Sequence, residues 1–393
     1  QAGAFTARAD DPSAIFFNPA GLAQLETREL LVSPNLAISK TEFAGVAPNP
    51  GFDIAEHTRT KGRFPFAAYY AHGLGGRVAA GIGVYHPYGF DVEWAFPAWF
   101  SGRYISTHSR ITPISFAPTA AVAIDDRLRV GAGANLVLST VEFARYFAAY
   151  DPISDATRTV GRVDLKSENG FGAGFNLGAQ WWPPGRLKFG ATYRSRVRVE
   201  HAGLADFRQV SSGDPAFDAV VAASFPPDQR ATTSIPFPAQ GALGVSYQAC
   251  PSWAFEADAQ LTWWSAFDRF TIAFAQDPSM NIEAEEGWSN ALGLRVGAEH
   301  RKGGTAAWSY RAGYSYDRTP QPRASLGPWL PDTDRHGLSL GFGHDGPQTS
   351  VNAYALWQIM PDRSTEGENR EGYDGTYSPT SLLAGLSLGF HFP

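Results

Sequence analysis

Aromatic side chains of a type and spacing that could bind an apolar molecule gather in one stretch of this sequence, between His86 and Ser106. Their density is unusual for a surface loop and predicts a site that captures a hydrophobic ligand. A small core that only holds the loop together explains the same residues equally well. The four side chains are Trp94, Phe96, Trp99 and Phe100.

A second apolar group lies near the N-terminus, where Ile15, Phe16 and Phe17 follow one another. These side chains could line an inner binding site, or they could simply pack the segment that carries them. If the ligand has a carboxylate, a guanidinium group is a natural partner, because it can form two parallel hydrogen bonds with it. The sequence offers several candidates and does not choose among them: Arg103, Arg194, Arg196 and Arg198.

Residues arranged for catalysis are absent from the sequence. Its serine, histidine and aspartate residues are scattered without a Gly-x-Ser-x-Gly elbow, and no histidine pair has the spacing of metal ligands on a helix. The single cysteine, Cys250, excludes an intramolecular disulfide and sites built from several cysteines. We therefore expect no catalytic residue, no metal and no cofactor. The enzyme alternative is a lipase built as an outer-membrane β-barrel. Such an enzyme would need a serine and a histidine paired on the outer, lipid-facing side of the barrel.

The composition fits a membrane barrel better than a helical membrane protein. Of the 393 residues, 13% are aromatic and 18% are charged, and the mean hydropathy is −0.22. No apolar run approaches the roughly 18 to 20 residues of a spanning helix, whereas alternating barrel strands average out as polar. A net charge of −6 argues against nucleic acid as a partner. Because no basic and apolar leader precedes Ala2, we expect that a secretory signal has been removed.

Alternation with a period of two runs along the chain after residue 28 and predicts β-strands. In the last segment, for example, Leu382, Leu386 and Phe390 interleave with Gly385 and Gly389. The pattern predicts an antiparallel barrel of about fourteen strands. They span residues 28–45, 62–72, 75–86, 108–124, 127–147, 163–182, 186–200, 232–248, 251–275, 287–299, 304–317, 334–345, 347–360 and 378–392.

Short connections alternate with long ones, which is typical of outer-membrane barrels with periplasmic turns. The short ones run from His72 to Gly75, Asp125 to Asp126, Pro183 to Gly185, Ala249 to Pro251, Arg301 to Gly304 and Asp345 to Pro347. In the predicted strand 186–200, Arg194, Arg196 and Arg198 share one face, which we expect to line the lumen because a bilayer would reject them. Glu256 and Asp258 lie on the equivalent face of a later strand and are expected to pair with these arginines.

Residues 1–27 break the strand pattern and contain two signals for the start of a helix. Asp11 precedes Pro12 and Asn18 precedes Pro19, so a capping side chain stands before a proline in both places. The segment therefore predicts short helices with apolar faces. In a barrel, such a segment is expected to fold into the lumen as a plug. A general porin, the third alternative, would lack this plug and would conduct ions.

At these residues the sequence resembles the FadL family of outer-membrane long-chain fatty-acid transporters, which includes the TodX-type hydrocarbon channels. The resemblance covers nearly the whole chain. One difference is at the C-terminus: proteins of this family end on an aromatic residue, whereas here Pro393 follows Phe392. It is carried by Asp11, Ser13, the run Asn18-Pro19-Ala20-Gly21-Leu22, Pro87-Tyr88-Gly89, Gly102-Arg103-Tyr104, Tyr193-Arg194-Ser195, Trp264-Ser265 with Phe267, and Pro331-Asp332 with Asp334-Arg335.

The resemblance implies a monomeric fourteen-strand outer-membrane barrel, residues 28–393, whose lumen is blocked by a small helical hatch, residues 1–27. It also implies that hydrophobic ligands are captured in the extracellular loops, pass to a site near the hatch, and leave sideways into the membrane lipid through a kink in the third strand. The Asn18-Pro19-Ala20 motif would lie near that kink. Gly81 and Gly83 are the candidates for the kink, because glycine within a strand often marks a bend. The expected partners are the ligand, outer-membrane lipid and lipopolysaccharide.

Overall fold

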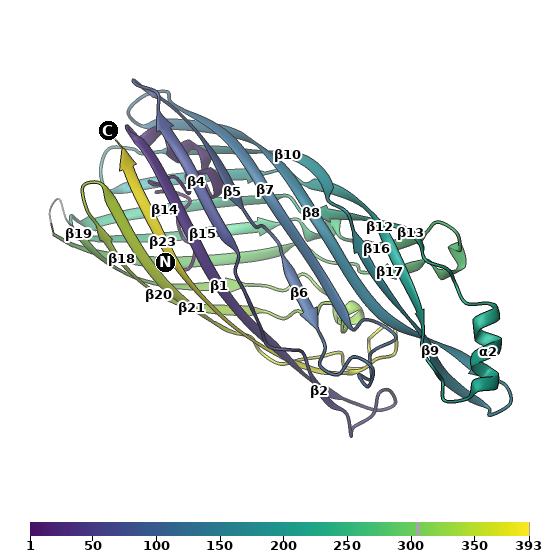
Figure 1. Ribbon diagram of the computed structural model, residues 1–393. Helices are drawn as coiled ribbons and strands as arrows, with labels where there is room; N and C mark the ends of the chain where they lie inside the picture. The colour runs from purple at the N-terminus through teal and green to yellow at the C-terminus, as the bar shows by residue number, and fades with distance from the viewer. Residues whose placement is uncertain (304–306, 393) are drawn as a thin grey trace.

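The computed structural model describes residues 1–303 and 307–392, and its strands close into an antiparallel barrel (Figure 1). The barrel has fourteen strands, as the sequence predicts. Closure comes from β1 (Arg28–Gly45), which pairs with β4 (Phe66–Gly73) on one side and with β23 (Gly375–Phe392) on the other. The predicted alternation holds in β23, where Leu382, Leu386 and Phe390 are exposed on the outer face.

Part of the wall consists of strands that run unbroken from end to end. Two short strands, β2 (Ala55–His57) and β22 (Arg363–Ser364), extend the pairing of β1 and β23 toward the loops. Beside β1 and β23, the unbroken strands are β7 (His108–Ala123), β8 (Leu128–Asp151), β19 (Ala307–Asp317), β20 (Arg335–Asp345) and β21 (Thr349–Ile359).

The other wall strands are each divided into two, which the sequence did not predict. Predicted strands 62–72, 163–182, 186–200, 232–248 and 251–275 are therefore wrong as single units, and 287–299 is only the second half of one. The divided strands are β3 (Lys61–Arg63) with β4, β5 (Val78–Tyr85) with β6 (Phe90–Glu93), β9 (Ala156–Ser167) with β10 (Gly170–Trp181), β11 (Leu187–Arg194) with β12 (Val197–Gln209), β13 (Gln229–Phe237) with β14 (Gln240–Cys250), β15 (Trp253–Thr262) with β16 (Arg269–Phe274), and β17 (Ile282–Glu285) with β18 (Ala291–Gly303).

The break between β11 and β12 exchanges the two faces of the strand, because the residues that it inserts shift the period of two. In β11 the even-numbered Arg194 points into the lumen, where it donates a hydrogen bond to Phe16 O. Beyond the break, the odd-numbered Val197 and Val199 of β12 are buried, whereas Arg196 and Arg198 are exposed. The prediction that all three arginines share the lumenal face is therefore wrong for Arg196 and Arg198.

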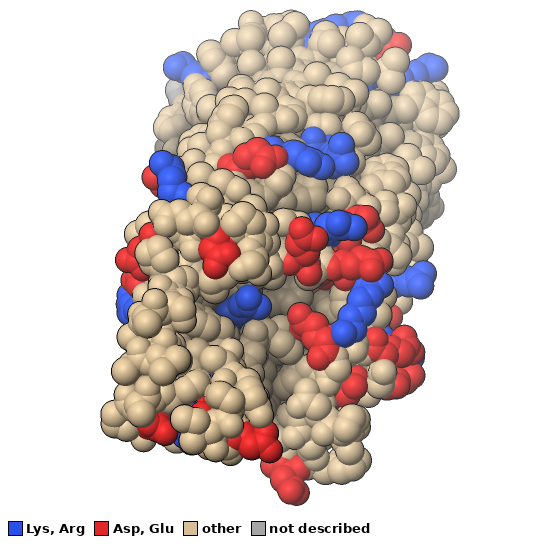
Figure 2. All heavy atoms as spheres, turned by 90° about the vertical axis from the view of Figure 1, so that its right-hand side faces the viewer, with Lys and Arg blue, Asp and Glu red and all other residues tan. Residues whose placement is uncertain are grey.

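The two ends of the barrel differ in the length of their connections. Short turns lie at the end that carries the C-terminus, and long loops lie at the other end, where Figure 1 shows α2 (Pro215–Ala223). The chain also forms three short 3-10 helices, η2 (Trp264–Ala266), η3 (Pro278–Met280) and η4 (Arg323–Ser325). Figure 2 looks onto the loop end, where acidic and basic side chains are interspersed. The predicted start of strand 304–317, the predicted turn from Arg301 to Gly304 and Pro393 involve residues outside those that the structure describes.

The N-terminal segment, residues 1–27, lies inside the barrel (Figure 1). It contains α1 (Ala14–Phe17) and η1 (Pro19–Gln24). Asn18 caps η1 as predicted, since its side chain accepts a hydrogen bond from Ala20 N. The predicted helix start at Asp11 and Pro12 is a turn instead, and α1 begins two residues after Pro12. Within the described residues, no helix has the length and apolar character needed to cross a bilayer.

Candidate functional site

Carboxylates on β15 hold the N-terminal segment by its main chain. Asp258 accepts hydrogen bonds from the amides of Phe5 and Thr6, at 2.9 and 3.0 Å, and Glu256 accepts one from Ala7 at 2.8 Å. Hydrogen bonds to an ionised acceptor are about twice as strong as those between neutral groups. The prediction that Glu256 and Asp258 pair with the arginines of residues 186–200 is therefore wrong.

A buried ion pair fixes the same part of the segment to β18, the strand next to β15. The guanidinium of Arg8 contacts Glu299 on β18 at 3.0 Å. Glu299 also accepts a hydrogen bond from Arg311 on β19, and Arg311 reaches Asn352 on β21. Breaking such a pair is costly because it leaves a buried charge without a partner. The start of the segment is thus tied to several neighbouring strands.

Asn18 ties the middle of the segment to the wall at a different place. Its amide nitrogen donates to Thr6 O at 2.8 Å and to Ala179 O of β10 at 3.0 Å. A Cβ on Gly178 would lie 2.1 Å from the Asn18 side-chain oxygen, so only glycine allows this approach. The motif therefore lies against β10 and, through Pro19 beside Gly131, against β8; the resemblance implies a place near the kink of the third strand.

Gly81 and Gly83 make room for the N-terminal segment and do not bend the third strand. Both are in regular pairing within β5, where Gly81 lies opposite Ala71 of β4 and Thr119 of β7. A Cβ on Gly81 or Gly83 would lie 3.0 or 2.9 Å from the side chain of Ile15. The expected kink at these two glycines is therefore wrong, because their lack of a side chain is used to seat Ile15.

The third strand is interrupted between β5 and β6 instead, from residue 86 to 89. Tyr88 has a φ of 57°, a left-handed conformation that takes it out of the ladder. Its ring turns inward and stacks on Phe237, with ring centres 6.1 Å apart. On the loop side of the break, β6 pairs with β7. Strand β4 does not continue beside β6, because it begins at Phe66. The ladder between the second and third strands is therefore interrupted at this level.

Arg194 and aromatic rings face the inner side of this break. Arg194 donates to Phe16 O at 2.8 Å, and its guanidinium lies 4.4 Å from the centre of the Phe16 ring. Phe16 contacts the Tyr85 ring edge to face at 5.0 Å. A cavity of about 20 Å³, large enough for one water molecule, lies between Tyr85, Tyr88 and Arg194. Of the predicted carboxylate partners on residues 186–200, only Arg194 is near the lumenal site.

The predicted capture residues fall into two pairs. Trp94 and Phe100 are buried and stack at 4.2 Å in a cluster with residues of other loops. Phe96 and Trp99 are 71% and 84% exposed. The alternative of a small loop core thus describes Trp94 and Phe100, whereas Phe96 and Trp99 remain open to the outside.

Arg103 braces the same loop. Its guanidinium donates to Phe100 O at 3.0 Å and to the Tyr104 hydroxyl at 3.0 Å, and it lies 4.5 Å from the centre of the Tyr104 ring. These contacts occupy two of its nitrogens within the loop itself. Residues 1–303 and 307–392 contain no group of three or more His, Cys, Asp or Glu side chains placed to hold a metal ion.

An apolar interior connects the loops to the break, and the sequence did not predict it. Phe270 stacks on Trp329 of a long loop at 5.8 Å, and Tyr88 contacts Trp264 at 5.6 Å, all within one cluster of buried side chains. The signal is present as alternating apolar residues in β12, β13 and β16, but the prediction that Arg196 and Arg198 face the lumen turns Val197 and Val199 away from it. Only the breaks show that it points inward.

The geometry agrees with comparisons to known proteins. A family model described as outer membrane protein transport protein (OMPP1/FadL/TodX) matches residues 2–392. The chain belongs to this family. Its place is therefore the bacterial outer membrane, in agreement with the predicted localisation.

Curated relatives in this family are transport proteins. A long-chain fatty acid transport protein of Escherichia coli O6:H1 is 22% identical over 299 residues, which are 70% of this chain and 65% of that protein. The chain thus spans slightly less than two thirds of that relative. The long-chain fatty acid transport protein of Salmonella typhi is 19% identical over 344 residues, covering 85% of this chain and 78% of its own.

Solved structures in the family share the fold. The Pseudomonas aeruginosa FadL homologue has a TM-score of 0.85 at 21% identity and covers 99% of this chain and 96% of its own. The Pseudomonas putida toluene transporter TodX has a TM-score of 0.78 at 15% identity, with 100% and 99% covered. At these identities the likeness supports the FadL-like barrel and leaves the ligand open.

The carboxylate anchors predict a measurable change in the N-terminal segment. Replacing Glu256 with Gln and Asp258 with Asn removes charge from the acceptors of the amides of residues 5–8. We expect hydrogen exchange of these amides to become about tenfold faster or more, because hydrogen bonds to charged groups contribute roughly 1.5 to 3 kcal/mol. Exchange measured by mass spectrometry checks this. Glu283→Gln, an exposed carboxylate on β17, is the matched control, and unchanged rates at residues 5–8 in the double variant would contradict the anchor.

Proposed function

We propose that this FadL-family protein is a passive channel that takes up hydrophobic small molecules, namely long-chain fatty acids or aromatic or aliphatic hydrocarbons. The observation that carries the proposal is the apolar interior that leads from the loop cluster to the break in the third strand. The names of the relatives support the same class, since two are called long-chain fatty acid transport proteins and TodX is called a toluene transporter. Because one chain forms a complete barrel, the protein acts as a monomer in this proposal.

In this proposal residues 1–27 act as a small helical hatch and residues 28–393 as the barrel around it. The anchors at Asp258, Glu256 and Glu299 support a hatch that stays in place and blocks the straight path through the lumen. Asn18, Pro19 and Ala20 hold its middle against the wall, and Gly81 and Gly83 accommodate Ile15. A molecule from the outside must then leave through the side.

Capture begins at the exposed rings of Phe96 and Trp99, which offer apolar surface at the loop end. Trp94 and Phe100 are buried behind Phe96 and Trp99. In this proposal Trp94 and Phe100 contact the ligand only after the loop opens. Arg103 holds the loop by its contacts to Phe100 and Tyr104. A hydrophobic molecule that leaves water here gains roughly 0.8 kcal/mol per buried methylene.

The inner site lies at the surface of the hatch, where Phe16 and Phe17 are half-buried and Ile15 supports them from its seat against Gly81 and Gly83. Arg194 is the candidate for a ligand carboxylate, since it lies above the Phe16 ring and one of its buried nitrogens has no hydrogen-bond partner among the described residues. The ligand then leaves sideways between β4 and β6, where the ladder is interrupted, and enters the bilayer. This exit replaces the one that we expected at Gly81 and Gly83.

The two alternatives fit less well. A porin needs an open lumen, whereas the N-terminal segment is bonded to several strands of this barrel. A lipase needs a serine that hydrogen bonds to a histidine, and the hydrogen bonds of the described residues contain no such pair. The relatives are named as transporters, which also favours a channel.

Closing the break should stop uptake while the barrel remains intact. Pro87→Thr with Gly89→Val raises strand propensity and supplies the missing amide, so that β5 can continue into β6. We expect uptake of radiolabelled oleate or toluene, in a strain without its own transporter, to fall to about a tenth or less. Pro118→Val, an exposed proline on β7, is the control. Normal uptake by a double variant that still shifts on unboiled SDS gels would place the exit elsewhere.

The hatch should make the protein a poor conductor of ions. In planar bilayers we expect the full chain to show little steady current, and a chain lacking residues 1–27 to conduct strongly, because the lumen of a barrel this size is wide enough for water once it is emptied. The Glu256→Gln, Asp258→Asn variant provides a second measurement if the deletion does not fold. Large steady conductance by the intact chain would favour the porin alternative.

A further inference from the structure

The outer wall has a step where β11 gives way to β12. Gly170 and Gly172 of β10 face inward, and a Cβ on them would lie 2.5 and 2.6 Å from the carbonyl oxygens of Glu200 and Arg198. Strand β12 therefore passes close against the inner side of β10. The next strand, β13, pairs with β12 and follows it inward.

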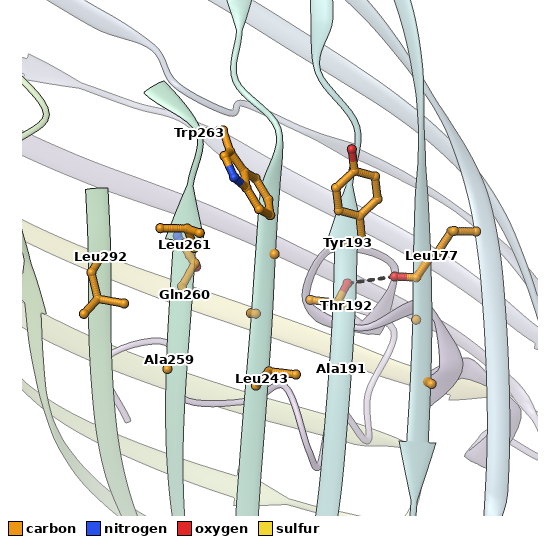
Figure 3. Close-up of a pocket in the computed structure, with 14 residues that line it drawn as sticks. Leu177, Ala191, Thr192, Tyr193, Leu243, Ala259, Gln260, Leu261, Trp263 and Leu292 are labelled. Carbon is orange, nitrogen blue, oxygen red and sulfur yellow. Dashed lines mark hydrogen bonds between the residues drawn. The ribbon is translucent and has the colours of Figure 1, made fainter. Parts of the chain in front are cut away.

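A groove of about 600 Å³ lies on the outer wall beside this step (Figure 3). Its floor is made of small residues, including Ala191 and Gly241, and its sides are Tyr193, Leu243 and Leu261. Leu243 is 67% exposed, as expected for a side chain that points away from the lumen. The groove is thus apolar, open to the bilayer and bounded by the step.

The extracellular end of the groove lies at the edge of the apolar belt. A row of paired residues crosses the wall at this level through Arg194, Gln240, Thr262 and Ala291. Just beyond this row the outer surface becomes polar, since Ser265 N donates to the side chain of Asn290 at 3.1 Å. This level corresponds to the headgroups of the outer leaflet.

Arg196 and Arg198 stand directly beyond the groove. Arg196 is three residues from Tyr193 along the same strand, so the two are within about 11 Å. Both arginines are exposed, and neither side chain forms an ion pair or hydrogen bond with a described residue. The nearby Glu200 accepts a hydrogen bond from the Ser234 hydroxyl. By contrast, Arg208 further along β12 is paired with Asp206.

We propose that the groove and these two arginines bind lipopolysaccharide of the outer leaflet, with an acyl chain in the groove and a lipid A phosphate at Arg196 and Arg198. Guanidinium groups bind phosphate through parallel, charge-assisted hydrogen bonds. A basic side chain at the edge of the bilayer is attracted by anionic headgroups. The proposal depends on the outer-membrane location of the protein and does not depend on which molecule it transports.

Native mass spectrometry of the purified full chain, titrated with lipopolysaccharide in mild detergent, tests the proposal. We expect Arg196→Gln with Arg198→Gln to weaken binding about tenfold or more, because charge-assisted hydrogen bonds are lost. Ala191→Phe, which fills the floor of the groove, should also weaken it. Arg208→Gln is the matched control and should bind normally. Lipopolysaccharide without its lipid A phosphates should bind the native protein as weakly as the intact lipid binds the double variant.

The heat-dependent shift on SDS gels must be normal in each variant, which shows that the barrel is folded. Unchanged lipopolysaccharide binding by the Arg196→Gln, Arg198→Gln variant or by Ala191→Phe would overturn the proposal. So would equal binding of the phosphate-free lipid. If the variants bind lipopolysaccharide normally but lose oleate uptake, the groove belongs to the transport route and the proposal is wrong. A channel that fails to transport but still binds the lipid would instead contradict the function proposed above.

Discussion

The carboxylates of Asp258 and Glu256 accept hydrogen bonds from the main chain of residues 5–8, and the architecture of the lumen depends on this interaction. A peptide segment inside a barrel has amides that water no longer satisfies, and each one left unpaired costs free energy. Carboxyl oxygens that accept these hydrogen bonds remove this cost without requiring a second sheet. Once the start of the segment is fixed, Asn18 and Ile15 can seat against glycines of the wall. The lumen is thereby divided into a filled part and an apolar part.

The breaks in neighbouring strands determine the character of that apolar part. Between β11 and β12 the break exchanges the faces of the strand, so that side chains which would have faced the bilayer fill the interior instead. Val197 and Val199 move inside, and Arg196 and Arg198 move outside. The same displacement produces the step and the groove on the outer wall. The change of face between β11 and β12 thus adds apolar side chains to the interior cluster and leaves two exposed arginines on the outer side of the wall.

The sequence predicted the barrel, its closure and the alternation of turns and loops, because a period of two and short turns are local properties. It did not predict the breaks, because the change of face between Arg194 and Val197 depends on how neighbouring strands stagger. Gly81 and Gly83 were interpreted as a bend because a glycine in a strand has two explanations, a bend or a close contact, and only the position of Ile15 separates them. Trp94 and Trp99 have the same chemistry and similar spacing, yet loops distant in sequence bury the first and leave the second exposed.

The central claim is that a hydrophobic ligand meets the outer surface of the N-terminal segment and leaves beside the break in the third strand. A fatty acid carrying a photoreactive diazirine on its chain tests this in intact outer membranes, with adducts located by mass spectrometry. The account predicts adducts at Phe16 and Tyr88 inside the barrel and at Phe64 or Phe66 beside the break. Adducts at residues 1–8 and Arg311, on the far side of the anchors, with none at Tyr88 or Phe66, would contradict it.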